Sequence, residues 1–182
     1  CMNAIEAEKT LQEADLLHSE EEVQTALDSL ATQINSEMQG KDPIVFCVMN
    51  GGVIPTGMLV PRFNFTFRLD YLHATRYREA TRGSDLHWKK AVDCDLSDQT
   101  VLVVDDILDE GYTLEAIVEH CLALGAADVY SAVLAEKKHD RGCNYKADFV
   151  GMEVMDRYVF GMGMDYKGYL RHLPAIYAVK GL

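Results

Sequence analysis

Long apolar runs, a basic charge balance and paired cysteines are all missing from this sequence of 182 residues. No apolar run approaches the roughly 18–20 residues that cross a bilayer, and the acidic N-terminus is the reverse of a secretory signal. The 17 Lys and Arg against 29 Asp and Glu give a net charge of −12. General nucleic-acid binding depends on cations that neutralise phosphates. We therefore expect a cytoplasmic protein with neither nucleic acid nor a membrane among its partners.

The five cysteines are odd in number and widely spread, and no two have the C-x-x-C spacing. The six histidines also lack the spacing typical of a metal site. The sequence therefore predicts neither a disulfide framework nor a zinc site, and it favours idle thiols in a reducing compartment. It leaves open whether Cys1, which precedes Met2, is native.

Apolar strands that alternate with amphipathic helices make up most of the chain. A capping-box pattern at residues 19–22 opens a predicted helix that Gly40 ends. Unbroken apolar runs at 44–49 and 101–104 are typical of central parallel strands, and residues 129–134 predict a third buried strand. Helical spacing over 113–124 predicts a helix between the last two strands. This alternation predicts an α/β fold, with an open, mainly parallel sheet flanked by helices.

Shorter patterns occupy the rest of the chain. They predict a short helix at 53–60 and strands at 65–71, 86–92, 149–152, 158–161 and 175–179. The polar, basic residues from 74 to 85 predict a long hairpin or a mobile loop. Ligands of open α/β sheets bind at the carboxyl ends of strands. The places to look for a site are therefore residues 50–52 and 105–113.

The clearest chemical pattern is V-L-V-V-D-D-I-L-D-E-G-Y-T-L, residues 101–114. An apolar strand brings Asp105 and Asp106 to its carboxyl end, and residues 109–113 turn directly into a helix whose free N–H groups can surround a phosphate. Gly111 permits a close backbone approach, and Thr113 can add a hydroxyl donor or cap the helix. Two carboxylates beside an anion loop suit a diol, so a ribose 5-phosphate fits both features.

An acid pair after a strand also occurs in proteins of a different kind, which match this sequence less well. A response-regulator receiver places such a pair near the start of about 120 residues, and fewer than that follow Asp106. The phosphate-loop pattern G-x-x-x-x-G-K-[ST] is absent. Gly161 and Gly163 lack the third glycine and the following helix of a dinucleotide site. A solvated acidic turn remains as the simplest alternative.

Residues 101–114 resemble the phosphoribosyl pyrophosphate signature of type I phosphoribosyltransferases, and residues 44–178 resemble the hypoxanthine-guanine phosphoribosyltransferases. Further matches follow in the family's order. They are the pyrophosphate loop at 49–52, the lid at 75–83, the purine-contacting lysine at 136–138 and the hood over the base at 158–161, 164–166 and Arg171. The resemblance implies a single domain over 1–182, with a core at about 40–155, a flexible lid at about 74–85, and a hood built from the N-terminal helix segment and about 156–182.

The resemblance also implies an activity in purine salvage. A 5-phosphoribosyl group would pass from phosphoribosyl pyrophosphate to N9 of hypoxanthine or guanine, giving IMP or GMP and pyrophosphate. Mg²⁺ would be the cofactor and a homodimer or homotetramer the assembly. Two alternatives stay open: a transferase that prefers another base, such as xanthine or uracil, and a ligand-sensing regulator of this fold without turnover.

Roles carry over position by position, and Asp109 would be the general base near N7 of the purine. The positions implied to bind phosphoribosyl pyrophosphate are Asn50, Gly51, Gly52, Asp105, Asp106, Asp109, Glu110, Gly111, Tyr112, Thr113 and Arg171. Those implied for the purine are Lys137, Tyr158, Val159 and Asp165, those for the metal are Asp105, Asp106 and Asp165, and those for the lid are Arg76 and Tyr77.

Some positions depart from the family pattern. Asp105 stands where Glu is usual, and Glu110 replaces a small hydroxyl residue, so we expect its side chain to point away from the phosphate. Asn50 stands where a basic residue is common. We hypothesise that three lid arginines replace that charge on closure: Arg76, Arg78 and Arg82. Adjacent Lys138 leaves open which lysine contacts the purine.

Overall fold

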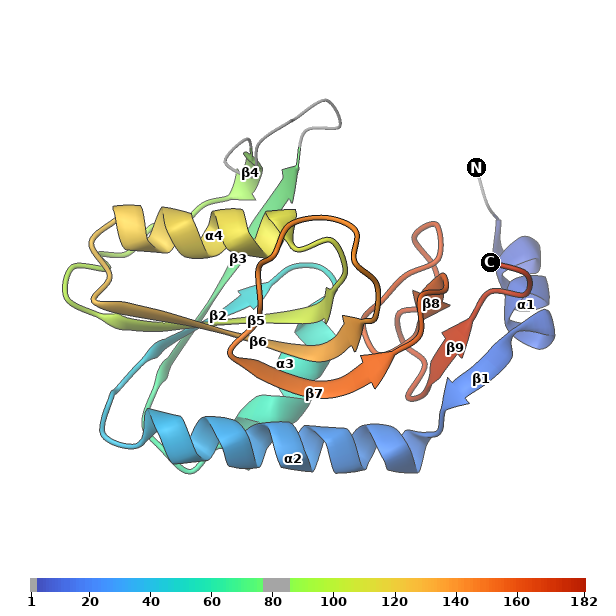
Figure 1. Cartoon of the computed structure of the whole chain (residues 1–182), viewed down its shortest axis with the longest axis horizontal. Helices are drawn as coiled ribbons and strands as arrows, with labels where there is room; N and C mark the ends of the chain where they lie inside the picture. The colour runs from blue at the N-terminus through green and yellow to red at the C-terminus, as the bar shows by residue number, and fades with distance from the viewer. Residues whose placement is uncertain (1–2, 77–85) are drawn as a thin grey trace.

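The computed structural model describes residues 3–76 and 86–182 and contains a six-stranded central sheet. Its strand order is β4-β3-β2-β5-β6-β7, and only the edge strand β4 runs antiparallel to its neighbour (Figure 1). The strands are β2 Ile44–Val48, β3 Arg68–Arg76, β4 Leu86–Lys90, β5 Thr100–Leu108, β6 Asp128–Lys137 and β7 Phe149–Val154.

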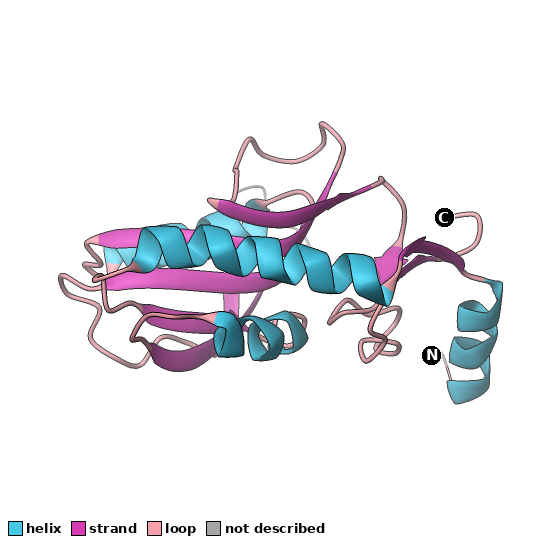
Figure 2. Cartoon of the chain, turned by 90° about the horizontal axis from the view of Figure 1, so that it is seen from below, coloured by secondary structure: helices cyan, strands magenta, loops and turns pink. Residues whose placement is uncertain are grey.

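Helices cover both faces of this sheet (Figures 1 and 2). Helix α2 (Glu20–Met38) lies on one face with α3 (Val53–Leu59) and the 3-10 turn Val60–Arg62, and α4 (Tyr112–Ala123) lies on the other. The unbroken apolar runs divide between the faces: Val101 and Val103 pack toward α4, and Leu102 and Val104 pack toward α2. Both faces of the central strands are therefore buried, which explains why their sequences do not alternate.

A second, three-stranded antiparallel sheet, which we call the hood sheet, joins the two ends of the chain. Its order is β1 (Asp15–His18), β9 (Ile176–Ala178) and β8 (Val159–Phe160). Helix α1 (Ala4–Glu13) packs beside it through Ala7, which shares an apolar cluster with Phe160. In Figure 1 the hood sheet faces the carboxyl ends of β5, β6 and β7, the edge where ligands of such sheets bind.

Three local predictions differ from the structure. The predicted strand at 65–71 is wrong, because β3 begins only at Arg68. The alternating aromatics instead form a cluster, with ring centroids 4.8 Å apart for Phe63 and Phe65. Thr113 does not cap α4, since Gly111 occupies that position at φ +90°. Helix α1 has no counterpart among the elements predicted from apolar spacing. No helix in the described ranges is long and apolar enough to span a membrane.

Candidate functional site

The carboxyl end of β5 opens into a cavity of about 390 Å³, which we call the anion-loop cavity. The loop after β5 turns into α4 at Gly111, and this turn requires a positive φ that glycine adopts without strain. The first turn of α4 therefore presents backbone N–H groups to the cavity. The predicted residues that line it are Gly51, Arg76, Asp105, Asp106, Asp109, Glu110, Gly111, Tyr112, Thr113 and Arg171.

Asp105 and Asp106 form a half-buried acid pair with little positive charge around it. Burial raises the pKa of Asp105 well above its usual range, and the charge of Asp106 raises it further. Burial also raises the pKa of Asp106. The pair accepts two backbone hydrogen bonds, from the N–H of Asp106 at 2.8 Å and from that of Ile107 at 2.7 Å. Arg171 supplies the cationic influence on both carboxyls.

This shortage of positive charge fits a magnesium ion bound together with a substrate. Among the described residues, no group of three or more His, Cys, Asp or Glu could hold a metal by itself, so the three predicted ligands do not form a protein-only cage. Asp165 instead accepts the N–H of Gly168 at 2.8 Å and lies 3.5 Å from the Arg171 guanidinium. Mg²⁺ is commonly bound by one or two carboxylates together with substrate phosphates and water. Asp105 and Asp106 can provide those carboxylates.

The predicted pyrophosphate loop follows β2, after a cis peptide between Met49 and Asn50. Gly51 is packed so closely against the acid pair that a Cβ there would lie 2.6 Å from Asp106 Cγ. Asn50 is exposed and is not part of the cavity lining, and Gly52 is buried where a Cβ would meet the Val48 carbonyl at 2.6 Å. Of the three predicted loop residues, Gly51 is the one that lines the cavity.

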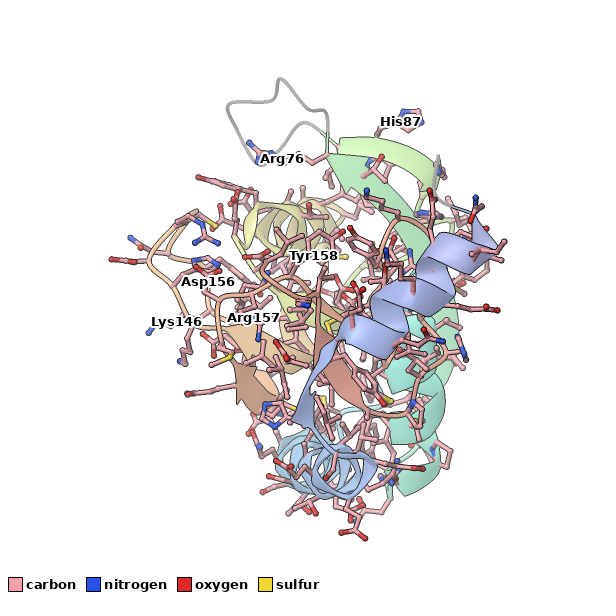
Figure 3. The ribbon with its side chains drawn as sticks, turned by 90° about the vertical axis from the view of Figure 1, so that its right-hand side faces the viewer. Arg76, His87, Lys146, Asp156, Arg157 and Tyr158 are labelled. Atoms are coloured by element: carbon pink, nitrogen blue, oxygen red, sulfur yellow. The ribbon has the colours of Figure 1, made fainter. Side chains whose placement is uncertain are left out.

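A second cavity of about 330 Å³, the purine-side cavity, lies between the end of β5 and the hood. It is lined by Asp106, Ile107, Asp109, Lys137, Tyr158, Val159, Met164 and Asp165. The four residues predicted for the purine are all in this set. Tyr158 keeps 43% of its surface exposed and makes an edge-on contact with Tyr166 at 5.0 Å, so a ring face is free for stacking (Figure 3).

Asp109 lines both cavities and is contacted by a lysine and a histidine. Lys137 Nζ lies 3.1 Å from its Oδ2, and His139 Nε2 lies 2.6 Å from its Oδ1. Burial pushes the pKa of Asp109 upward, but the hydrogen bonds from His139 and Lys137 outweigh it, so the pKa lies below its usual value. Lys138 points elsewhere: it is half exposed and pairs with Glu153 at 3.0 Å. The structure therefore places Lys137, and not Lys138, beside the purine-side cavity.

The segment predicted to form a lid includes Arg76, at the end of β3. The Arg76 guanidinium lies 4.2 Å from the centre of the Tyr112 ring, and both residues line the anion-loop cavity. The other predicted lid residues, Tyr77, Arg78 and Arg82, lie outside the described residues. Glu110 is exposed, and its carbonyl accepts the N–H of Cys143 at 3.0 Å.

The model of the "Phosphoribosyl transferase domain" family matches residues 13–167 of this chain. The chain belongs to that family. The hypoxanthine-guanine phosphoribosyltransferase of Aquifex aeolicus is 32% identical over 91% of this chain and 94% of its own length. The Bacillus subtilis enzyme of that name is 31% identical over 91% and 92%. A solved hypoxanthine-guanine phosphoribosyltransferase from Bacillus anthracis superimposes with a TM-score of 0.85 at 28% identity, covering 91% of this chain and 98% of its own.

These comparisons confirm the resemblance and the fold class predicted from the sequence. The structure of this phosphoribosyltransferase also shows contacts that sequence reasoning missed. His139 and Arg141 were not predicted, yet both approach Asp109, at 2.6 and 4.0 Å. No short-range pattern points to them, because the contact joins residues 30 positions apart. Ile107 and Met164 lie in the predicted signature and hood segments, but neither was predicted to line the site, since apolar lining residues look like core in the sequence.

Proposed function

We propose that this phosphoribosyltransferase transfers the 5-phosphoribosyl group of phosphoribosyl pyrophosphate to N9 of a 6-oxopurine, hypoxanthine or guanine, forming IMP or GMP and pyrophosphate in purine salvage. One observation carries the proposal. Asp109 stands where the anion-loop cavity meets the purine-side cavity, so one carboxylate borders both substrates.

In this reaction the purine N9 electron pair attacks the anomeric carbon, and the bond from that carbon to the pyrophosphate oxygen breaks. Pyrophosphate leaves with the bonding pair, and the proton on N7 passes to Asp109. Positive charge develops on the sugar and negative charge on the leaving group. The lowered pKa of Asp109 keeps it ionised and ready to accept that proton at neutral pH.

The phosphoribosyl side is bound by backbone and carboxylate groups. The N–H groups at the start of α4 surround the 5-phosphate, and Asp105 and Asp106 hold the ribose hydroxyls. Bound Mg²⁺, held by Asp105 and Asp106, would neutralise charge on the pyrophosphate leaving group. Arg171 and the backbone at Gly51 border the same cavity and contact the pyrophosphate.

The purine side depends on an exchange of partners by Lys137. In the structure its Nζ donates to Asp109 Oδ2 at 3.1 Å. When a 6-oxopurine enters, Nζ moves to the purine O6, which frees Oδ2 to face N7. Adenine has an exocyclic amino donor at that position and leaves the lysine without an acceptor. Tyr158 stacks on the base, and the Val159 backbone borders its edge.

The test is a spectrophotometric assay with phosphoribosyl pyrophosphate and Mg²⁺, in which hypoxanthine, guanine, xanthine and adenine are offered in parallel. We expect nucleotide formation with hypoxanthine and guanine and none with adenine. A preference for xanthine would keep the mechanism and overturn the assigned base. Binding of phosphoribosyl pyrophosphate without turnover on any base would overturn the enzymatic function and favour a ligand sensor.

The assembly and location remain predictions of this proposal. A homodimer or homotetramer is expected, and sedimentation equilibrium would distinguish either from a monomer. The cytoplasmic location expected from the sequence suits substrates that are freely diffusing small molecules.

A further inference from the structure

His139 is the buried partner of the proposed general base. Its side chain is only 5% exposed, although it lies in the polar turn that follows β6. Its Nε2 atom is 2.6 Å from Asp109 Oδ1, and its Nδ1 atom is 3.0 Å from the backbone nitrogen of Arg141. Both ring nitrogens therefore have a partner within hydrogen-bond distance.

The Arg141 contact decides which nitrogen carries the proton. A backbone N–H can only donate, so Nδ1 must be the acceptor and holds no hydrogen. The proton of the neutral ring is then on Nε2, which donates it to Asp109 Oδ1. The turn thus supplies a directed donor to one oxygen of the carboxylate and leaves the other oxygen to Lys137.

The turn that carries His139 also contacts the segment that leads to the purine-side cavity. The Arg141 guanidinium binds both carboxylate oxygens of Asp156, one at 2.8 Å. Asp156 lies two residues before Tyr158, on the segment shown in Figure 3. A bidentate arginine–carboxylate pair fixes orientation as well as distance. The position of His139 is therefore set by the chain that carries the stacking tyrosine.

His139 lies on the side of Asp109 away from the purine. It lines a third cavity, of about 380 Å³, together with Lys137 and Arg141, and it lines neither the anion-loop cavity nor the purine-side cavity. The groups that face Asp109 are thus Lys137 and His139 in direct contact and the Arg141 guanidinium at 4.0 Å. Of these, Lys137 alone also borders the purine-side cavity.

We propose that His139 is a positioning residue that locks Asp109 Oδ1 through Nε2–H, so that Oδ2 is the oxygen that takes the purine proton when Lys137 moves away. This inference rests on the proposed function, because it assigns a task to each oxygen of the proposed base. It also gives Arg141 the task of fixing the tautomer of His139.

The test compares His139→Leu with His139→Gln, whose amide nitrogen can replace the Nε2–H donor. We expect roughly tenfold lower kcat in His139→Leu, because a misplaced catalytic group loses about that much or more. The acidic limb of its kcat/KM profile should move to higher pH, with an unchanged KM for phosphoribosyl pyrophosphate. His139→Gln should restore both. A matched control is His18→Gln, which alters a histidine 3.2 Å from Glu22 that lines none of the three cavities.

His139→Asn distinguishes loss of positioning from loss of folding. Its side chain is polar, but its amide nitrogen takes the place of Nδ1 and not of Nε2, so this variant should behave like His139→Leu. An unchanged kcat and acidic limb in His139→Leu would overturn the inference, and so would equal impairment in all three variants. Carboxyl carbon NMR of Asp109 gives a readout without turnover: its titration should move to higher pH in His139→Leu. Wild-type protein inactive on every base would refute the proposed function, whereas this titration tests the histidine on its own.

Discussion

Asp105 and Asp106 on one hand and Asp109 on the other lie within five residues, yet their carboxyls have opposite electrostatic surroundings. The acid pair is half-buried side by side, and burial raises both pKa values. Asp109 is 42% exposed, but it contacts Lys137 and His139, which lower its pKa. One segment therefore holds two carboxyls that feel the charge of Arg171 but stay raised in pKa, and one carboxyl that Lys137 contacts directly.

The difference gives the two kinds of carboxyl different tasks in the proposed reaction. The acid pair is short of positive charge, which Mg²⁺ bound together with the substrate would supply. In the proposed reaction the protein itself provides Lys137 and His139 as donors to Asp109, which keep it ionised before the purine arrives. The first arrangement suits binding and the second suits proton transfer.

The largest effect should come from removing the base. Asp109→Asn keeps the shape of the side chain and should lower kcat by about 10²- to 10⁴-fold, the usual contribution of a general base. Steady-state kinetics with hypoxanthine provide the measurement. Asp140→Asn, at an exposed position in the turn beside His139, is the control and should keep wild-type kcat. A wild-type kcat in Asp109→Asn would show that the proton leaves by another route.

A glycine substitution tests how tightly the acid pair is packed. Gly51→Ala places a Cβ 2.6 Å from Asp106 Cγ, and such overpacking should cost about 1–3 kcal/mol of unfolding free energy. It should also raise the KM for phosphoribosyl pyrophosphate. Gly57→Ala is the matched control, since its Cβ would meet nothing within 4 Å and alanine favours a helix by about 0.5–1 kcal/mol. Urea unfolding of both variants measures their free energies of unfolding. Equal stability would show that the loop is not packed against Asp106.

The two kinds of carboxyl should respond oppositely to neutralisation in thermal unfolding. The pKa of Asp105 is higher in the folded chain than in the unfolded chain, so stability falls as pH rises above the ordinary value of 3.8 toward the raised one. Asp105→Asn should therefore gain about 0.5–2 kcal/mol near neutral pH and nothing well below 3.8.

Asp109→Asn should change stability in the opposite direction. The lowered pKa of Asp109 stabilises the folded chain above the ordinary value, and this contribution is lost as pH falls through the lowered one. Because the carboxylate is partly exposed, the loss near neutral pH should stay below about 1 kcal/mol. If Asp105→Asn and Asp109→Asn are both destabilised at neutral pH, the two kinds of carboxyl do not differ as described.

The last prediction concerns Arg76, in the segment predicted to form a lid. Arg76→Ala removes a guanidinium that lines the anion-loop cavity. An exposed ion pair with a substrate phosphate would contribute up to roughly 1 kcal/mol, so we expect the KM for phosphoribosyl pyrophosphate to rise up to about fivefold with an unchanged kcat. Initial rates at varied phosphoribosyl pyrophosphate measure this. An unchanged KM would remove Arg76 from the binding site.

The phosphoribosyl side of the site could be predicted from the sequence because its chemistry is local. Asp105, Asp106 and Gly111 follow one another on a strand, a loop and a helix start, and each of these has a short sequence pattern. The central strands could be predicted for the same reason. The Phe63 to Phe67 segment could not, because alternating aromatics pack as a cluster as readily as they pair as a strand.

The purine side could be predicted only through the resemblance, because tertiary structure assembles it. Lys137 ends β6, Tyr158 precedes a two-residue strand, and both line one cavity with Asp109 although they come from distant parts of the chain. The role of His139 depends on the path of a turn that has no regular pattern. The sequence also could not distinguish Asn50 from the neighbouring Gly51, although Gly51 alone of the two lines the cavity and approaches the acid pair.

The division of work between the two kinds of carboxyl is tested most directly by calorimetric titration with phosphoribosyl pyrophosphate and Mg²⁺. Two proteins are compared: Asp109→Asn, and the double variant Asp105→Asn with Asp106→Asn. We expect Asp109→Asn to retain binding of phosphoribosyl pyrophosphate while turning over purine poorly, and the double variant to lose binding. Equal loss of binding in both proteins, or wild-type binding in the double variant, would contradict this division of roles between the two kinds of carboxyl.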